Sequence, residues 1–220
     1  KKIKDSLKYI ETHKEIRDVL VTGGDALSLS DDELEFIISN LRNMTHIEII
    51  RIGTRMLVNL PQRITEKLSE LLSKYHPIYI NTQFNHPIEL TKESKKALKI
   101  LADNGIILGN QMVLLNGINN NKYIVRRLNE MLLAERVRPY YIFHAKPVQG
   151  TDHFQTSVAE GIEILEYLRG NTSGLAIPTY VFNAPNGLGK IPLNPNYLLS
   201  DNGNELIFRT WENKQVSWFL

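Results

Sequence analysis

The stretch Val181-Phe182-Asn183-Ala184-Pro185-Asn186-Gly187-Leu188-Gly189-Lys190 turns an apolar run into a loop that ends on a lysine. The apolar run starts at Thr179 and has the pattern of a buried strand. Proline and glycine then favour a turn, and Lys190 follows the last glycine. A lysine beside a flexible backbone at the end of a strand is well placed to form a Schiff base. Because most lysines are solvated surface groups, this stretch alone leaves both interpretations of Lys190 open.

The segments before this stretch alternate between strand patterns and helix patterns. Several of the helical runs follow residues that are typical of helix N-caps. The expected strands are 18–22, 46–53, 77–84, 106–115, 137–144 and 178–182. The expected helices are 3–16, 31–42, 61–74, 91–104, 121–135 and 157–170. This alternation predicts an α/β fold with a parallel sheet, either open or closed into a partial barrel.

The pattern changes after Pro192, where three short strand-like runs surround the turn Asp201-Asn202-Gly203-Asn204. These runs predict a small β meander. We therefore assign residues 1–192 to a partial (βα) barrel core and residues 193–220 to C-terminal strands of the same unit. The chain begins with a helix where the alternation calls for a strand, so the first barrel strand is expected upstream.

Composition limits the class of protein. The 220 residues are 42% hydrophobic and 23% charged, which is ordinary for a globular core. A net charge of +2 does not indicate a nucleic-acid surface, and no apolar run has membrane-spanning length. The chain has no cysteine, so it can form neither a disulfide nor a thiolate metal site. Without a secretory leader at its start, the sequence predicts a cytoplasmic protein.

Polar and glycine-bearing segments follow the expected strands, and in barrel enzymes such loops build the active site. The segments are Gly23-Gly24-Asp25, Gly53-Thr54-Arg55, Gln83-Phe84-Asn85-His86, Asn110-Gln111, His144-Ala145-Lys146 and the loop 183–190. Their positions favour a chemical role for Lys190. Period-two alternation also predicts one shared face, which would point into the barrel and carries Tyr140, Ile142, His144 and Lys146.

Three of these segments have separate physical interpretations. The glycine pair 23–24 lets a ligand approach the backbone, and the carboxylate of Asp25 could pair with an ammonium group. The alternative is a tight turn with an exposed aspartate. The amide of Gln111 could bind a ribose, or it could be a satisfied buried amide. Arg51 and Arg55 could bind anionic groups.

In order and spacing, these strings resemble the lysine 2,3-aminomutase family of radical S-adenosylmethionine (SAM) enzymes, from about residue 15 to 200. The matching strings are 18–25, 51–55, 81–87, 108–111, 136–142 and 183–190. The resemblance implies a partial radical SAM barrel that uses SAM, a [4Fe–4S] cluster and pyridoxal 5′-phosphate (PLP). It also implies a small amino acid substrate and a reducing electron donor, and it leaves a homo-oligomer open.

The resemblance implies a role for each matching residue. Lys190 falls where the family forms its Schiff base with PLP, and Tyr140 falls near the PLP ring. The string Gly23-Gly24-Asp25 matches the motif that meets the methionyl amino group of SAM. Gln111 matches a position near the ribose of SAM.

Two departures from the family pattern predict the substrate. The lysine enzymes hold the terminal ammonium of lysine with two aspartates, whereas the matching positions here are Lys146 and Asn183. A cation and a neutral donor would repel an ammonium and accept a carboxylate. The sequence therefore predicts interconversion of L-glutamate and β-glutamate by amino migration. The alternative is that Lys146 reaches solvent and Asn183 only forms a turn.

A third departure is the absence of the three-cysteine motif that holds the cluster in this family. The cluster ligands are expected upstream of these residues, and a chain of these residues alone is expected to be inactive. The remaining alternatives are a lysine or protein-lysine 2,3-aminomutase, a Schiff-base aldolase that uses Lys190 without a cluster, and a non-catalytic barrel that binds an anion.

Overall fold

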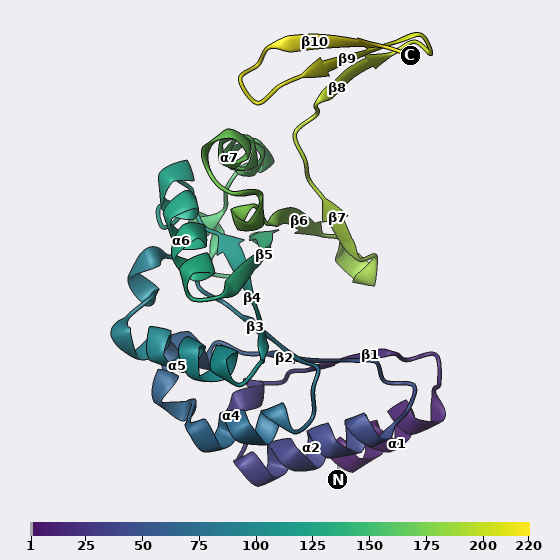
Figure 1. Ribbon diagram of the computed structural model, residues 1–220, viewed down its shortest axis with the longest axis vertical. Helices are drawn as coiled ribbons and strands as arrows, with labels where there is room; N and C mark the ends of the chain where they lie inside the picture. The colour runs from purple at the N-terminus through teal and green to yellow at the C-terminus, as the bar shows by residue number, and fades with distance from the viewer. Residues whose placement is uncertain (1) are drawn as a thin grey trace. The chain divides into compact units, whose positions relative to one another are not determined.

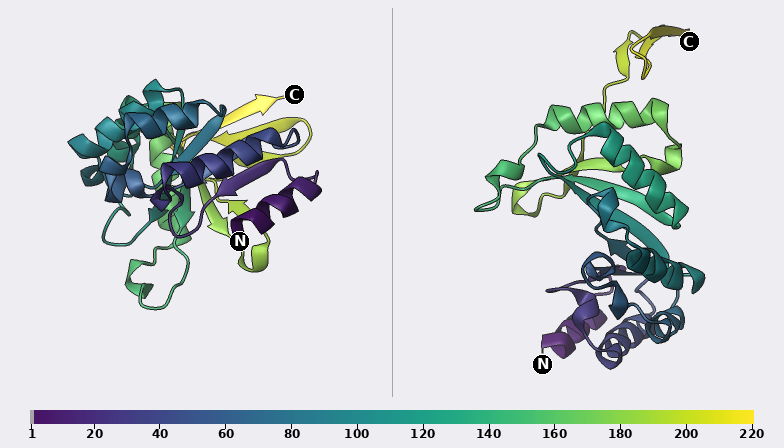
Figure 2. Two further views of the ribbon diagram at one scale, coloured as in Figure 1. Left: turned by 90° about the horizontal axis from the view of Figure 1, so that it is seen from below. Right: turned by 90° about the vertical axis from the view of Figure 1, so that its left-hand side faces the viewer.

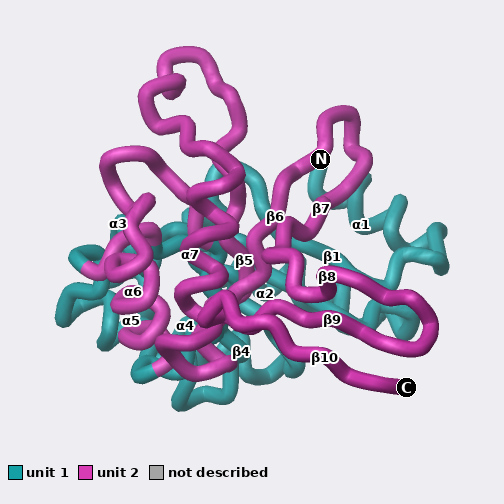
Figure 3. The backbone as a smooth tube through the Cα atoms, turned by 90° about the horizontal axis from the view of Figure 1, so that it is seen from above, with its two compact units in different colours: residues 1–84, 88–111, 134–138 teal, residues 85–87, 112–133, 139–220 magenta. Residues whose placement is uncertain are grey.

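The computed structural model describes residues 2–220 (Figure 1). The chain divides into two compact units, which Figure 3 shows in separate colours. Unit 1 comprises residues 1–84, 88–111 and 134–138, and unit 2 comprises residues 85–87, 112–133 and 139–220. Strand order follows the chain from β1 to β7, and the last three strands form a separate sheet.

Unit 1 alternates strands with helices, as the sequence predicts. Its strands are β1 (Asp18–Val21), β2 (Ile49–Gly53), β3 (Ile78–Thr82) and the first residues of β4 (Ile107–Leu114). Its α-helices are α1 (Lys2–Thr12), α2 (Asp31–Asn43), α3 (Met56–Asn59), α4 (Glu66–Ser73) and α5 (Lys92–Asp103). Short 3-10 helices are η1 (Ala26–Ser28), η2 (Pro61–Arg63) and η3 (Pro87–Glu89). Neighbouring strands from β1 to β4 pair in parallel.

One face of the unit 1 sheet packs on helices, and the opposite face carries half-exposed residues. In Figure 1, and from below in Figure 2, helices α1, α2, α4 and α5 lie on one side of the strands. The fully buried apolar residues of β2 and β3 are Ile50, Ile52, Ile78 and Ile80. Arg51, Gly53 and Asn81 alternate with them and are half-exposed. Arg51 and Asn81 therefore lie on the face away from the helices.

Unit 2 continues the alternation and ends in a meander. It holds the end of β4, nearly all of α6 (Lys122–Ala134), most of β5 (Val137–His144), α7 (Val158–Asn171), β6 (Thr179–Asn183) and β7 (Lys190–Pro192). Short 3-10 helices are η4 (Asp152–Phe154), η5 (Gly174–Ala176) and η6 (Pro185–Gly187). Strand β6 is parallel to β5, and β7 is antiparallel to β6. The predicted meander is confirmed as β8 (Leu198–Asp201), β9 (Glu205–Arg209) and β10 (Gln215–Phe219), all antiparallel.

The meander docks on helix α7. A Cβ added at Gly170 would lie 2.2 Å from the ring of Trp211, so only glycine lets this tryptophan approach the helix so closely. Arg209 of β9 forms an ion pair with Glu166 of α7. Its Nη2 also donates to the carbonyl oxygen of Asn196 at 3.2 Å. Packing and charge together hold β8–β10 against α7.

The helix expected over residues 61–74 was wrong. Residues 61–63 form η2, and Thr65 starts a separate helix, α4. The Oγ1 of Thr65 accepts a hydrogen bond from the backbone N–H of Leu68 at 3.1 Å. This N-cap begins a new helix inside the expected one, so the predicted helix is interrupted at Thr65.

The predicted loop after β6 reverses the chain, because it connects β6 to the antiparallel strand β7. Asn186, Gly187 and Gly189 have positive φ values of 58°, 74° and 92°. Lys190 then begins β7, which pairs with β6. Among residues 2–220, no helix has both the length and the apolar character needed to cross a bilayer.

Candidate active site

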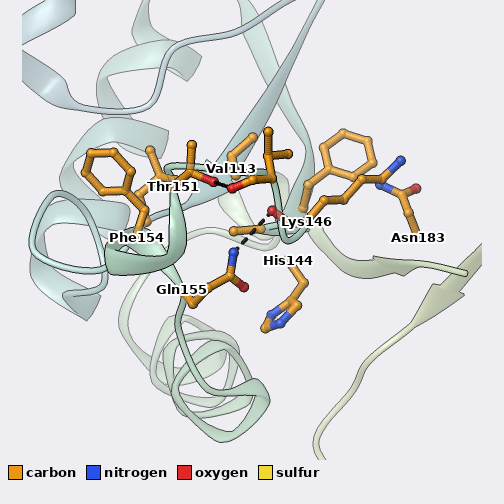
Figure 4. Close-up of a pocket in the computed structure, with 11 residues that line it drawn as sticks. Val113, His144, Lys146, Thr151, Phe154, Gln155 and Asn183 are labelled. Atoms are coloured by element: carbon orange, nitrogen blue, oxygen red, sulfur yellow. Dashed lines mark hydrogen bonds between the residues drawn. The ribbon is translucent and has the colours of Figure 1, made fainter. Parts of the chain in front are cut away.

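A pocket of about 350 Å³ lies in unit 2 at the carboxyl ends of β4, β5 and β6 (Figure 4). Its walls come from these strand ends and from the segment 145–157 that follows β5. Val113, Phe143 and Phe154 supply apolar lining. The carboxyl ends of parallel strands are where barrel enzymes bind their substrates, so this pocket is the candidate site of unit 2.

The pocket brings together the two residues that were predicted to select the substrate. Lys146 lies two residues after the end of β5, and Asn183 is the last residue of β6. Both line the pocket, and Figure 4 draws them on the same side of it. Lys146 forms no ion pair with any of residues 2–220. Its charge is therefore not neutralised by a carboxylate of the described chain.

Two hydrogen bonds hold the backbone around Lys146 in place, although the Lys146 side chain is exposed. The Nε2 of Gln155 donates to the carbonyl oxygen of Lys146 at 3.1 Å. The Oγ1 of Thr151 donates to the carbonyl oxygen of Val148 at 2.8 Å (Figure 4). These bonds fold the segment 145–157 over the pocket and fix the position from which the Lys146 side chain extends.

Lys190 lies directly opposite Asn183 in the β6–β7 hairpin. Opposed residues of an antiparallel pair point to the same face, so these two side chains share one face of the hairpin. The Nζ of Lys190 lies 5.8 Å from the centroid of the Tyr141 ring, within the range of a cation–π contact. Lys190 makes no ion pair within residues 2–220, so an amine is available at this position.

Tyr141, which was not predicted from the sequence, is the aromatic residue that contacts Lys190. Tyr140 lies against it, with ring centroids 3.9 Å apart and a hydroxyl–hydroxyl hydrogen bond of 3.1 Å. The predicted role of Tyr140 beside the PLP ring remains a prediction. The sequence of β5 does not indicate which of these two adjacent tyrosines contacts Lys190, because both side chains carry a phenol.

The expectation that Ile142 and His144 point into the barrel, together with Tyr140 and Lys146, was wrong for Ile142 and for His144, because both lie against Tyr180. Ile142 is 2% exposed and pairs with Tyr180, which is fully buried. Tyr180 lies against α7, where a Cβ added at Gly161 would come within 2.3 Å of its ring. That face of β5 therefore packs under α7. Alternation fixes which residues share a face, but not which face a helix covers.

His144 also lines the pocket, and its ring is held by Tyr180. The Nδ1 of His144 lies 2.7 Å from the Tyr180 hydroxyl. Burial lowers the pKa of His144. Burial, and to a lesser extent the negative charge of Glu160, raises the pKa of Tyr180 to about 12. No local signal predicts this pair, because its members lie 36 residues apart on different strands.

In unit 1, the carboxylate of Asp25 is held by three donors at the carboxyl end of β1. Its Oδ1 accepts from the N–H of Leu27 at 3.0 Å and from the Oγ1 of Thr54 at 2.7 Å. Its Oδ2 accepts from the N–H of Arg55 at 2.7 Å. Asp25 therefore ties the loop after β1 to the loop after β2. Most of the acceptor sites of this carboxylate are already used, so little of it is left for a ligand ammonium.

Gly23 and Gly24 precede this aspartate and have open surroundings. A Cβ added at either glycine would have no heavy atom within 4 Å, and neither glycine has a positive φ. The fold itself therefore does not require glycine at these two positions. An exposed glycine backbone at the end of a strand fits a ligand that must approach the chain closely.

The other predicted residues of unit 1 differ in their pairing. Gln111 is half-exposed on β4, and its side chain makes no hydrogen bond to the described residues. The Nε of Arg51 bonds to Asp18 at 2.9 Å, and the Nη2 of Arg55 bonds to Glu89 at 2.7 Å. Both arginines are thus already paired with carboxylates. Within residues 2–220, no group of histidine, aspartate or glutamate side chains could hold a metal ion.

The same fold occurs in solved structures of low sequence identity. *Streptococcus suis* SuiB bound to S-adenosylmethionine superposes with a TM-score of 0.60 at 13% identity, over 83% of this chain and 43% of that one. A radical SAM methyltransferase from *Sphaerobacter thermophilus* gives 0.56 at 12% identity, over 76% and 51%. These likenesses show that the chain shares the fold of these two proteins.

Sequence comparisons find relatives of high identity. A family model described as lysine-2,3-aminomutase matches residues 165–218. The glutamate 2,3-aminomutase of *Clostridioides difficile* is 59% identical over 97% of this chain and 51% of its own length. The L-lysine 2,3-aminomutase of *Methanococcus maripaludis* is 52% identical over 98% and 50%. Over nearly its whole length the chain is similar to members of the lysine 2,3-aminomutase family, and it spans about half the length of the curated relatives it matches.

Proposed function

We propose that the full-length protein is a glutamate 2,3-aminomutase, which interconverts L-glutamate and β-glutamate with SAM, PLP and a [4Fe–4S] cluster. The observation that carries this proposal is that Lys146 and Asn183 line one pocket at the strand ends. The relative that is 59% identical is itself described as a glutamate 2,3-aminomutase, which supports the same substrate.

The charge of Lys146 favours a substrate with a terminal carboxylate. Two like charges about 4 Å apart repel by roughly 1 kcal/mol in water and roughly 4 kcal/mol near a protein surface. Since every 1.4 kcal/mol changes affinity tenfold, this repulsion is enough to reject the ammonium of lysine. Asn183 carries no charge and can donate an N–H to a carboxylate oxygen. Both residues thus favour glutamate over lysine.

Lys190 fits the role of the amine that binds PLP. It has no ion-pair partner among the described residues, it lies opposite Asn183, and its Nζ lies over the Tyr141 ring. When bound, PLP supplies an extended π-system that stabilises charge or an unpaired electron on the substrate. In this proposal Lys190 anchors the cofactor, while Lys146 and Asn183 bind the far end of the substrate.

Gly23, Gly24 and Gln111 fit a SAM site. The open backbone of the two glycines offers polar groups to the amino acid part of SAM, and Gln111 has an amide without a partner in the described chain. Asp25 has a positioning role, because its carboxylate holds the loops after β1 and β2 in place. When bound, SAM would supply the radical that starts the reaction.

The cluster does not fit the residues of this chain, because the chain contains no cysteine. An iron–sulfur cluster of this class needs thiolate ligands. The proposal therefore requires cysteines from a part of the protein outside these 220 residues. It also includes an electron donor for the cluster and a cytoplasmic location.

The direct experiment measures turnover by the full-length protein with SAM, PLP and a reductant under anaerobic conditions. L-glutamate should yield β-glutamate, and L-lysine should react at least about tenfold more slowly in kcat/KM. Faster turnover of lysine than of glutamate would contradict the assigned substrate. A reaction that requires Lys190 but neither PLP nor SAM would instead indicate a Schiff-base aldolase.

A further inference from the structure

We propose that Asn186, at the tip of the β6–β7 hairpin, is a site of spontaneous deamidation, and that its conversion to aspartate or isoaspartate alters the turn before Lys190. The modification itself does not depend on the proposed function. Its effect on PLP binding does, because that effect rests on the proposed role of Lys190.

The sequence contains four asparagines that are each followed by glycine: Asn104, Asn116, Asn186 and Asn202. In such a pair, the main-chain nitrogen of the glycine can attack Cγ of the asparagine, because glycine has no Cβ to obstruct the approach. The attack uses two groups, the side-chain amide and the N–H of the glycine. Hydrogen bonds that hold these groups in place therefore oppose it.

Two of the four pairs are held at both groups. The side-chain amides of Asn104 and Asn116 each donate to a main-chain carbonyl oxygen, at 3.0 Å and 3.2 Å. The N–H groups of Gly105 and Gly117 also donate, at 3.1 Å and 2.9 Å. Neither pair can close a ring without losing these bonds.

A third pair lies in the turn between β8 and β9, and it is exposed. The Oδ1 of Asn202 accepts from the N–H groups of Asn204 and Glu205 at 3.0 Å and 2.8 Å. The N–H of Gly203 donates to the Oδ1 of Asp201 at 3.0 Å. This pair therefore has the same exposure as the hairpin tip but is held by three hydrogen bonds.

The pair at the hairpin tip has no such protection. Asn186 and Gly187 are exposed, and neither the side chain of Asn186 nor the N–H of Gly187 bonds to any of residues 2–220. Asn186 has a left-handed backbone, with φ of 58° and ψ of 26°. Ring closure turns the Gly187 nitrogen toward Cγ and opens this turn. The bond from Leu188 N–H to the Pro185 carbonyl oxygen opposes the opening, and at 3.3 Å it is long.

The reaction needs water and neither an oxidant nor a reductant. The nitrogen of Gly187 forms a bond to Cγ of Asn186, and the side-chain nitrogen leaves as ammonia with the proton that the Gly187 nitrogen loses. Water then opens the cyclic imide at one of its two carbonyl carbons. Opening at Cγ gives aspartate, and opening at the main-chain carbonyl carbon gives isoaspartate. Both products carry a new negative charge, and isoaspartate adds one carbon to the main chain.

The hairpin links this chemistry to the candidate site. Asn183 and Lys190 are paired at its base, and next to them the N–H of Ala184 donates to the carbonyl oxygen of Gly189 at 2.9 Å. Loop length selects the turn that a hairpin can form, so a main chain lengthened at the tip cannot keep the same turn. Modification should therefore displace Lys190 and weaken its linkage to PLP.

The chemical test incubates the full-length protein in mildly alkaline buffer at body temperature and follows each peptide by mass spectrometry. Deamidation adds about 1 Da to a peptide. The peptide with Asn186 should gain this mass at least about tenfold faster than the peptide with Asn202, because only the second pair must break hydrogen bonds held by the protein at both groups. A rate at Asn186 equal to or below that at Asn202 would overturn the inference.

The functional test uses Asn186→Gly, which removes the reactive side chain and keeps a residue that readily adopts a positive φ. It should retain its PLP absorbance band while the wild type loses the band in proportion to modification at position 186. Asn202→Gly is the matched control and should decline like the wild type. Modified wild type with a full PLP band would overturn the effect on Lys190. If fresh protein shows no PLP band but position 186 still gains mass, the proposed function fails and the modification stands.

Discussion

The two units differ in whether the protein itself pairs the charged side chains near the strand ends. In unit 1, the carboxylate of Asp25 has three protein donors, and Arg51 and Arg55 are each paired with a carboxylate. In unit 2, Lys146 and Lys190 have no carboxylate partner among residues 2–220. Charges in unit 1 hold loops in place, whereas charges in unit 2 are available to a ligand.

This difference indicates how each unit binds. Where side chains are already paired, a ligand must use the backbone, and the open surroundings of Gly23 and Gly24 allow that. Where amines are unpaired, an anionic or carbonyl-bearing ligand can use them directly. Substitutions at charged residues should therefore disturb folding in unit 1 and binding in unit 2.

The largest effect is expected at Lys190. Lys190→Ala removes the amine that would bind PLP, so turnover should fall by at least about 10³-fold, the scale seen when a covalent group is removed. The PLP absorbance band of the internal Schiff base should disappear, while thermal stability stays close to that of the wild type. Lys214→Ala, an exposed lysine of the meander, is the matched control. If Lys190→Ala kept the wild-type absorbance band, Lys190 would not be the residue that binds PLP.

The next effect is expected at Asp25 and concerns stability. Asp25→Asn replaces one carboxylate oxygen by an N–H donor, so the side chain can no longer accept hydrogen bonds from both Arg55 and Thr54. The free energy of unfolding should therefore fall by about 2–4 kcal/mol. Denaturant unfolding of the protein measures this change. Asp5→Asn, at an exposed position of α1, should change stability by less than about 0.5 kcal/mol. If Asp25→Asn is as stable as the wild type but loses SAM, its carboxylate binds the ligand directly.

A smaller effect is expected at Gly23, and here binding and folding should separate. Gly23→Ala adds a methyl group that meets no protein atom within 4 Å, so stability should stay within about 0.5 kcal/mol. The same methyl occupies space that the ligand would use, so SAM affinity should fall about tenfold by calorimetry. Gly174→Ala has equally open surroundings in unit 2 and should leave SAM binding unchanged. Equal SAM affinity in both variants would argue against a backbone site at Gly23.

The smallest effect is a pH dependence of stability that comes from His144. Burial lowers its pKa in the folded state, so below about pH 6.5 the unfolded chain binds more protons than the folded one. Stability from the neutral ring is present above about pH 6.5 and is lost as pH falls further. His144→Gln should therefore lose less stability than the wild type between pH 7 and pH 5. Parallel curves for the two proteins would show that His144 titrates normally.

Much of the fold could be predicted because its signals are local. The capping box of Ser30 and Glu33 marks the start of α2, and the positive φ of 75° at Gly105 marks the end of α5. Strand β5 has the predicted bounds, 137–144. The break at Thr65 was missed because the apolar period continues across it, and β7 was missed because three residues are too few to show a period.

The resemblance to a known family selected Lys146 and Asn183, because they stand at the positions of its two substrate-binding aspartates. Their charge and hydrogen-bonding capacity then predicted the substrate, and the two residues line one pocket. The contact of Tyr141 with Lys190 and the bond between His144 and Tyr180 depend on strand pairing and on which face α7 covers. Both faces of β5 carry aromatic or apolar residues, so its sequence does not specify the covered face.

The central claim is that Lys146 and Asn183 select a terminal carboxylate. The most direct measurement compares kcat/KM for L-glutamate and L-lysine in the wild type and in the double variant Lys146→Asp with Asn183→Asp. The account predicts that the glutamate-to-lysine ratio falls by at least about 100-fold, or about 2.7 kcal/mol, and that Lys214→Asp leaves it unchanged. An unchanged ratio in the double variant would contradict the account.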